Sequence, residues 1–111
     1  GSDAVVLFAG LSATFESEAS DHDIVFPPEQ AALIDAVSTA NKRTIVVLNN
    51  GSPMLFGPWL TRVPAMIEAW YPGQEGATAL VEILTGKVNP SGRLPATFLA
   101  KAEDAPAYGT Y

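Results

Sequence analysis

The hydrophobic pattern along the chain begins with two continuous apolar runs separated by a run with helical periodicity. Residues 3–10 (DAVVLFAG) and 44–49 (TIVVLN) are the continuous runs, which are typical of strands buried on both faces of a parallel sheet. Residues 29–41 (EQAALIDAVSTAN) follow a proline pair and place apolar side chains on one face of a helix. The predicted stripe of this helix comprises Ala31, Leu33, Ile34, Val37 and Ala40. This order of strand, helix and strand predicts a βαβ unit.

The second half of the chain predicts shorter elements. Three prolines between residues 53 and 64 restrict the next segment to a short helix at 59–62. Residues 65–70 (AMIEAW) are a third strand candidate, and residues 74–85 (QEGATALVEILT) are a second amphipathic helix that ends before a glycine. Residues 93–98 (RLPATF) contain a proline, which places this extended segment at an edge of the sheet or outside it.

These elements predict an α/β fold, a three-layer α/β/α sandwich with a mainly parallel sheet. Three strands are few for such a sheet, since sheets commonly have about four to six strands. We therefore expect residues 3–111 to be part of a larger, truncated domain, whose sheet a second copy of the chain could complete. Residues 1–2 (Gly-Ser) are typical of a cloning scar.

Composition narrows the function further. The chain has 111 residues and a net charge of −6 without a basic cluster, so we expect neither a nucleic-acid partner nor an anionic membrane partner. It has no cysteine and one histidine, which excludes a thiolate site and a multi-histidine metal site, and we expect no metal and no cofactor. No apolar run approaches the roughly 18 residues that a membrane span needs.

Titratable side chains gather in the loop between the first strand and the first helix. They are Glu16, Glu18, Asp21, His22 and Asp23. Loops at the carboxyl ends of parallel strands often bind ligands, although a solvated polar loop also explains such a run. The loop lacks the G-x-G-x-x-G pattern of a dinucleotide site, and its carboxylates would repel phosphate. If the stretch is extended, Glu16 and Glu18 face the same side, and such a pair can supply a general acid.

Four sequence motifs resemble those of a known protein family. They are ESEASDHDIVFPPEQ, TIVVLNNGSP, AWYPGQEGATALVEILTG and KVNPSGRLPATF, in this order. At these spacings they closely resemble the C-terminal α/β-sandwich domain of glycoside hydrolase family 3, the β-glucosidase and β-xylosidase family. The resemblance covers nearly all of the chain from Asp3 to Tyr108, and the WYPGQEG run and the NPSGRLP turn are highly specific in combination.

The resemblance implies a retaining exo-glycosidase that removes terminal, non-reducing sugars from β-linked glucosides, xylosides or short oligosaccharides. In this family the nucleophile is an aspartate on a preceding barrel domain, which is absent here, so the chain alone should be inactive. The family motif E-G-x-D-R matches residues 18–22, which implies that Glu18 is the acid/base, with Glu16 as the fallback. It also implies that Asp21 and His22 contact the sugar. A periplasmic or secreted protein would fit the family, but this chain carries no signal.

Two positions depart from the family motif and keep an alternative open. Ala19 replaces the usual glycine, and His22 replaces the usual arginine. They point to a non-catalytic α/β module that binds a carbohydrate or a partner. The aromatic residues Trp59, Trp70 and Tyr71 could stack on a sugar, but all three adjoin strand or helix ends, where core packing is the usual role.

Overall fold

The computed structural model describes residues 1–18 and 21–110, so the departure at Ala19 lies outside the described residues. Three strands, β1 (Val5–Gly10), β2 (Thr44–Asn49) and β3 (Ala65–Glu68), form a parallel sheet in the order β1-β2-β3. The α-helices are α1 (Pro28–Ala40) and α2 (Gly76–Leu84). Two 3-10 helices, η1 (Pro58–Arg62) and η2 (Ala102–Asp104), complete the described elements. The predicted α/β class with a mainly parallel sheet is confirmed.

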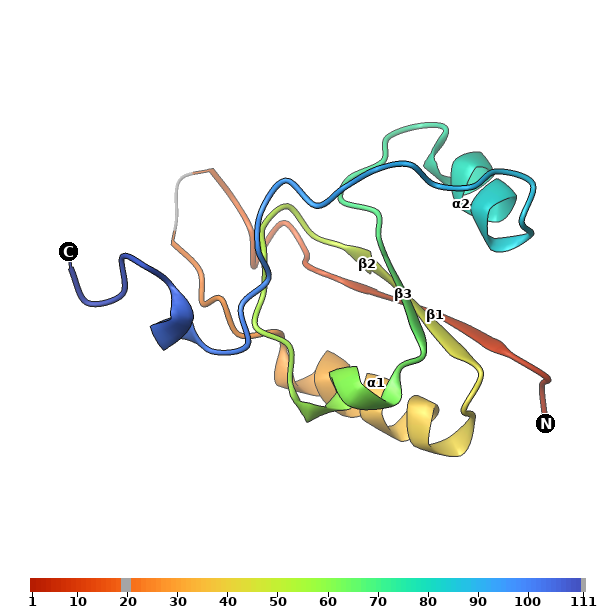
Figure 1. The fold of residues 1–111 in the computed structure, drawn as a ribbon, viewed down its shortest axis with the longest axis horizontal. Helices are drawn as coiled ribbons and strands as arrows, with labels where there is room; N and C mark the ends of the chain where they lie inside the picture. Colours follow the sequence, from red (N-terminus) through yellow and green to blue (C-terminus); the bar gives the residue numbers. More distant parts are fainter. Residues whose placement is uncertain (19–20, 111) are drawn as a thin grey trace.

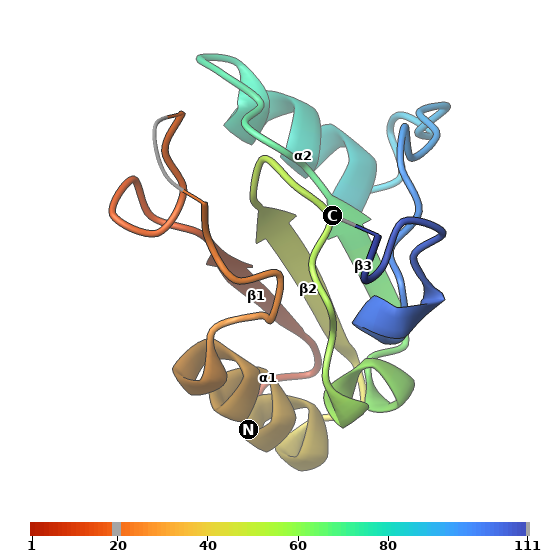
Figure 2. The same cartoon turned by 90° about the vertical axis from the view of Figure 1, so that its left-hand side faces the viewer.

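The helices lie on opposite sides of the sheet. Figures 1 and 2 show α1 and η1 below the strands and α2 above them. The segment 93–98, which was expected at an edge of the sheet or outside it, forms no strand and lies outside the sheet. No helix among residues 1–18 and 21–110 is long and apolar enough to cross a membrane.

The core fills the space between the sheet and the layer formed by α1 and η1. Its buried members are Phe26, Ile34, Val46, Leu48, Met54 and Trp59. Val46 and Leu48 are two residues apart in β2 and therefore point to the same face of the sheet. The ring of Trp59 lies 5.2 Å from that of Phe56 and 5.8 Å from that of Phe26, centroid to centroid. An aromatic cluster thus forms part of this core.

Three details of the predicted elements are wrong. The strand within residues 3–10 was expected to be buried on both faces, but Val6 and Phe8 of β1 are 42% and 58% exposed, so one face of this strand is open. Leu33 was expected in the apolar stripe of α1, but its side chain is 51% exposed, whereas Ser38 is fully buried. The buried stripe is narrower than predicted because α1 packs mainly against η1 and β2. The third strand was expected to reach Trp70, but it ends at Glu68, because Trp70 adopts a positive φ of 52° that no strand accommodates.

The end of β1 is fixed by contacts that direct the acidic loop. The side chain of Gln30 in α1 accepts a hydrogen bond from the Gly10 backbone N–H (2.8 Å) and donates one to the Gly10 carbonyl oxygen. A Cβ atom on Gly10 would lie 2.1 Å from the carbonyl oxygen of Asn49, so only glycine fits. Leu11 then donates a backbone hydrogen bond to Asn49 (2.9 Å). The loop therefore leaves the sheet beside the end of β2.

Candidate active site

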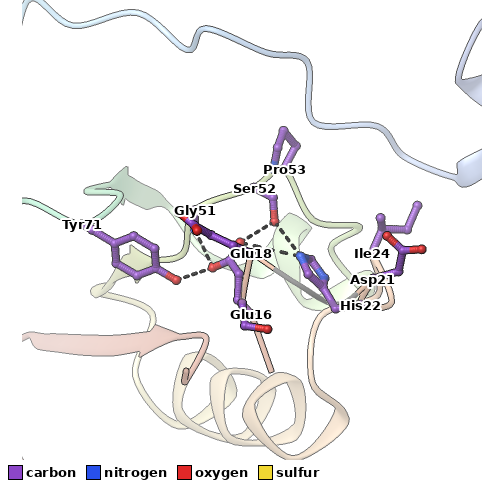
Figure 3. Close-up of a pocket in the computed structure, with 10 residues that line it drawn as sticks. Glu16, Glu18, Asp21, His22, Ile24, Gly51, Ser52, Pro53 and Tyr71 are labelled. Atoms are coloured by element: carbon purple, nitrogen blue, oxygen red, sulfur yellow. Dashed lines mark hydrogen bonds and ion pairs between the residues drawn. The ribbon is translucent and has the colours of Figure 1, made fainter. Parts of the chain in front are cut away.

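The loops that follow the three strands surround an open cavity of about 700 Å³ at the carboxyl edge of the sheet. Parallel pairing brings the ends of β1, β2 and β3 to this edge. The described residues that line the cavity are Glu16, Ser17, Glu18, Asp21, His22, Ile24, Gly51, Ser52, Pro53 and Tyr71. All four candidate residues of the acidic loop therefore lie on one cavity (Figure 3).

Glu16 is the side chain that joins these loops (Figure 3). Its carboxylate accepts a hydrogen bond from the backbone N–H of Gly51, with an N···Oε2 distance of 2.8 Å. It accepts another from the Ser52 hydroxyl, with an Oγ···Oε1 distance of 2.8 Å. The Tyr71 hydroxyl donates a third hydrogen bond to Oε2, and His22 Nε2 lies 3.7 Å from Oε1. One carboxylate thus ties the loop after β1 to the loops after β2 and β3.

These contacts set the charge of Glu16. Desolvation by itself raises the pKa of this carboxyl group, because it disfavours the charged form. The hydrogen bonds from Tyr71, Ser52 and Gly51, together with the nearby His22, lower the pKa and outweigh desolvation. The pKa of Glu16 therefore lies below its ordinary value of 4.5, and the side chain is a carboxylate at neutral pH.

Tyr71 reaches Glu16 because the chain turns sharply after β3. Trp70 has a positive φ of 52°, which is uncommon for any residue other than glycine. Its backbone N–H donates to Glu68 Oε1 (2.9 Å), and its carbonyl oxygen accepts from Asn49 Nδ2 (3.0 Å). The hydrogen bond to Glu16 is the main cause that raises the pKa of Tyr71 to about 12. The Tyr71 phenol therefore stays a hydrogen-bond donor well above neutral pH.

His22 contacts the protein through both ring nitrogens. Nδ1 lies 2.8 Å from the carbonyl oxygen of Asp23, which only accepts, so this nitrogen carries a hydrogen. Nε2 lies 3.2 Å from Ser52 Oγ. The ring also packs against Phe15, with a centroid distance of 5.6 Å, and the side chain is only 18% exposed. The polar atoms of His22 are therefore largely used within the site.

Glu18 and Asp21 have a different setting. Both residues are exposed and both line the cavity. Within residues 1–18 and 21–110, neither carboxylate forms a hydrogen bond or an ion pair. Glu16 and Glu18 thus lie in one loop but differ in their hydrogen bonding. The Glu16 carboxylate is held by protein donors, whereas the Glu18 carboxylate lines the cavity without such a partner among the described residues.

Glu68 is an acidic residue that does not line this cavity but is close enough to Glu16 to be influenced by its charge. Glu68 ends β3, where desolvation raises its pKa, while the Trp70 backbone N–H and the Asn50 side chain act in the opposite direction. The charge of Glu16 adds to the increase. Glu68 Oε2 and Asn50 Oδ1 are buried and lack a hydrogen-bond partner among the described residues. This carboxyl group is therefore the one that the fold holds closest to the neutral form.

Sequence reasoning found the acidic loop but missed its partners. Gly51, Ser52 and Tyr71 lie 35, 36 and 55 residues from Glu16, and no local pattern links them. The expected core role is confirmed for Trp59, which is 2% exposed, but it is wrong for Tyr71, which is 58% exposed. No cluster of three or more His, Cys, Asp or Glu side chains that could hold a metal ion is found in the described part of the chain.

A cavity lined by carboxylates at the carboxyl edge of a parallel sheet is typical of an α/β domain that binds its ligand through acidic groups. The sequence profile of the glycosyl hydrolase family 3 C-terminal domain matches residues 1–111. The chain therefore belongs to glycosyl hydrolase family 3, and the resemblance noted from its motifs is confirmed.

Known relatives agree with this assignment. The chain is 42% identical over 113 aligned residues to β-glucosidase B of Emericella nidulans, covering 99% of the chain and 13% of that protein. It is 38% identical to an exo-α-(1→6)-L-arabinopyranosidase of Bifidobacterium longum, covering 95% of the chain and 14% of that protein. The crystal structure of a β-glucosidase from Kluyveromyces marxianus in complex with glucose superposes with a TM-score of 0.87 at 37% identity. That match covers 95% of the chain and 13% of the solved structure.

Proposed function

We propose that this chain is the acid/base part of a retaining, exo-acting β-glycosidase of the β-glucosidase or β-xylosidase type. The full-length protein would remove terminal, non-reducing sugars from β-linked glycosides or short oligosaccharides. The nucleophile would be an aspartate on a barrel domain outside this chain, which spans about 13% of the relatives it matches. Family membership supports the reaction class, and the carboxylates on an open cavity support the location.

Glu18 is the proposed acid/base, and its setting is the observation that carries the assignment. A retaining enzyme needs a carboxyl group that protonates the leaving oxygen and then deprotonates water, with about 5 to 5.5 Å between the two catalytic carboxyl groups. Such a group must change its protonation state and reach the substrate. Glu18 is exposed on the cavity and is not tied to donors in the described part of the chain.

Glu16, the fallback, suits the acid/base role less well. Three donors hold its carboxylate, and they lower its pKa below 4.5. A carboxyl group with a lowered pKa is deprotonated at neutral pH and therefore has no proton to donate, and protonating it would leave those donors without a charged partner. Glu18 therefore fits the acid/base role better than Glu16.

Asp21 and His22 are the proposed sugar contacts. Asp21 lines the cavity with an exposed carboxylate, which can accept hydrogen bonds from sugar hydroxyl groups. His22 also lines the cavity, but its ring nitrogens already contact Asp23 and Ser52. We therefore assign the direct polar contact mainly to Asp21, while His22 contributes the ring surface that borders the sugar.

The test is the variant Glu18→Gln in the full-length protein. It should lose far more activity on glycosides with poor leaving groups than on activated aryl glycosides, because only poor leaving groups need a proton. Azide attacks the glycosyl-enzyme without a general base and should restore turnover on activated substrates. Glucosides, xylosides and α-L-arabinopyranosides form the substrate panel, and Glu103→Gln, an exposed carboxylate of η2, is the matched control. Equal losses on both leaving-group classes would contradict the assignment.

A further inference from the structure

We propose that Glu16 is a positioning residue, whose carboxylate fastens the loop that carries Glu18 to the loops after β2 and β3. The inference rests on the proposed acid/base role of Glu18. It concerns what places Glu18 over the cavity, and it gives Glu16 a role that does not involve touching the substrate.

The path of the acidic loop shows why a fastening contact matters. The loop is held to the β2 side at its two ends, where Leu11 donates to the Asn49 carbonyl oxygen (2.9 Å) and Leu55 donates to the Ile24 carbonyl oxygen (2.7 Å). Between these ends Glu16 contacts both neighbouring loops, and Glu18 follows it by two residues. Two residues of extended chain span at most about 7 Å. The position of the Glu16 carboxylate therefore limits where Glu18 can lie.

The receiving loops have features that fit this contact. A Cβ atom on Gly51 would lie 3.0 Å from Glu16 Oε1 and 3.0 Å from Tyr71 Cε2, so the absence of a side chain permits the close approach. Trp70 adopts its positive φ directly before Tyr71, a conformation that costs about 1–3 kcal/mol in a residue other than glycine or asparagine. Strained backbone of this kind persists where the surrounding contacts favour it. The missing side chain of Gly51 and the turn at Trp70 thus bring two hydrogen-bond donors, the Gly51 N–H and the Tyr71 hydroxyl, to the Glu16 carboxylate.

The charge states of Glu16 and Tyr71 also favour a stable hydrogen bond between them. Glu16 is a carboxylate at neutral pH and Tyr71 keeps its proton, so the hydrogen bond between them persists across the working range of most enzymes. Charge-assisted hydrogen bonds of this kind are roughly twice as strong as neutral ones. Replacing Glu16 by glutamine removes the charge and turns one acceptor atom into a donor that faces other donors.

A double-mutant cycle in the full-length protein tests the proposal. Glu16→Gln should lower kcat about 10- to 100-fold on poor leaving groups with little change in KM, because a misplaced catalytic group costs rate more than binding. In the Glu18→Gln background the same change should have almost no further effect, since its influence passes through Glu18. Azide should rescue Glu18→Gln strongly on activated substrates and Glu16→Gln more weakly, because in the second variant Glu18 is displaced but still present. Independent losses that multiply in the double variant would overturn the proposal and indicate general damage to the fold.

Milder variants keep the test informative if Glu16→Gln folds poorly. Tyr71→Phe and Ser52→Ala each remove one donor, whereas Ser52→Thr retains the hydroxyl and should restore activity. Full activity in both Tyr71→Phe and Ser52→Ala would overturn the positioning role while leaving Glu18 intact as the acid/base. If Glu18→Gln itself loses no activity on poor leaving groups, both this inference and the proposed function fail. Full azide rescue of Glu16→Gln, together with no rescue of Glu18→Gln, would show that Glu16 is itself the acid/base and would overturn the proposal.

Discussion

Replacing Glu68 by glutamine should stabilise the domain at neutral pH, although this residue lies next to the proposed site. The carboxyl group is half-buried, and desolvation raises its pKa above the ordinary value of 4.5. One of its oxygens, Oε2, and the nearby amide oxygen of Asn50 are buried acceptors without a partner among the described residues. Glutamine keeps an acceptor for the Trp70 backbone N–H and offers an NH₂ group in place of one oxygen.

The magnitude follows from the partners that the structure leaves unmatched. A buried polar group without a hydrogen bond costs about 1–3 kcal/mol. Glu68 is only partly buried and solvent screens its charge, so we expect a gain at the low end, about 0.5–1 kcal/mol.

The sign of the pH dependence makes this prediction specific. A carboxyl group with a raised pKa contributes favourably below pH 4.5, and this contribution is lost as the pH rises through the folded-state pKa. The wild-type domain should therefore lose stability relative to Glu68→Gln as the pH rises from 4 to 7. Amide hydrogen exchange of β2 and β3, compared between the variant and the wild type at each pH, measures this difference in the full-length protein.

A control separates the local effect from a general effect of charge. Glu103→Gln removes an exposed carboxylate from η2 and should change exchange in β2 and β3 by less than about 0.5 kcal/mol at any pH. If Glu68→Gln instead weakens protection at pH 7, or if its effect is the same at pH 4 and pH 7, then Glu68 is held as a stabilising carboxylate and the reasoning is wrong.

Two further predictions concern contacts that tolerate little change. Gly51→Ala should lower activity on poor leaving groups, because the new Cβ would lie 3.0 Å from Glu16 Oε1. Gly92→Ala is the control for the same kinetic assay: its new Cβ would meet no atom within 4 Å, so this variant should behave like the wild type. Ile34→Val in α1 should reduce the unfolding free energy by about 0.5–1.5 kcal/mol, because Ile34 is fully buried. Leu33→Val, on the exposed side of the same helix, should reduce it by less than about 0.5 kcal/mol. Hydrogen exchange of α1 measures both changes. Equal effects within either pair would contradict the assigned contacts.

The elements that the sequence predicted well are those with a continuous local pattern. The strand at residues 44–49 is predicted with its observed bounds, because a β-branched run packs on both faces of the sheet. The helix after the proline pair is predicted within about one residue, since proline favours the first helical turn. The breadth of its buried stripe depends on how many elements pack against it, which no local pattern contains. Leu33 was therefore misplaced.

The arrangement of the candidate site could be predicted only in part. That the loop after β1 carries the candidate acid was predicted from the position of its carboxylates and from the family motif. The resemblance favoured Glu18 over Glu16 as the acid/base, but the contacts that hold the Glu16 carboxylate could not be predicted, because its donors lie 35 to 55 residues away. The turn at Trp70, which directs Tyr71 toward Glu16, likewise requires the side chains of Asn49 and Glu68 on neighbouring strands.

A short chain can bring several loops to one candidate site because of how parallel sheets are built. Three consecutive strands end at one edge, so three loops meet there without help from other parts of the protein. If the nucleophile lies on another domain, as proposed, then two independent structures control the distance between the catalytic carboxyl groups. Under this proposal the contacts of Glu16 would set the position of the acid within its own domain, and the interface between the domains would set its distance from the nucleophile. Changes at Glu16 should therefore act selectively on poor leaving groups, whereas changes at the interface should affect all substrates alike.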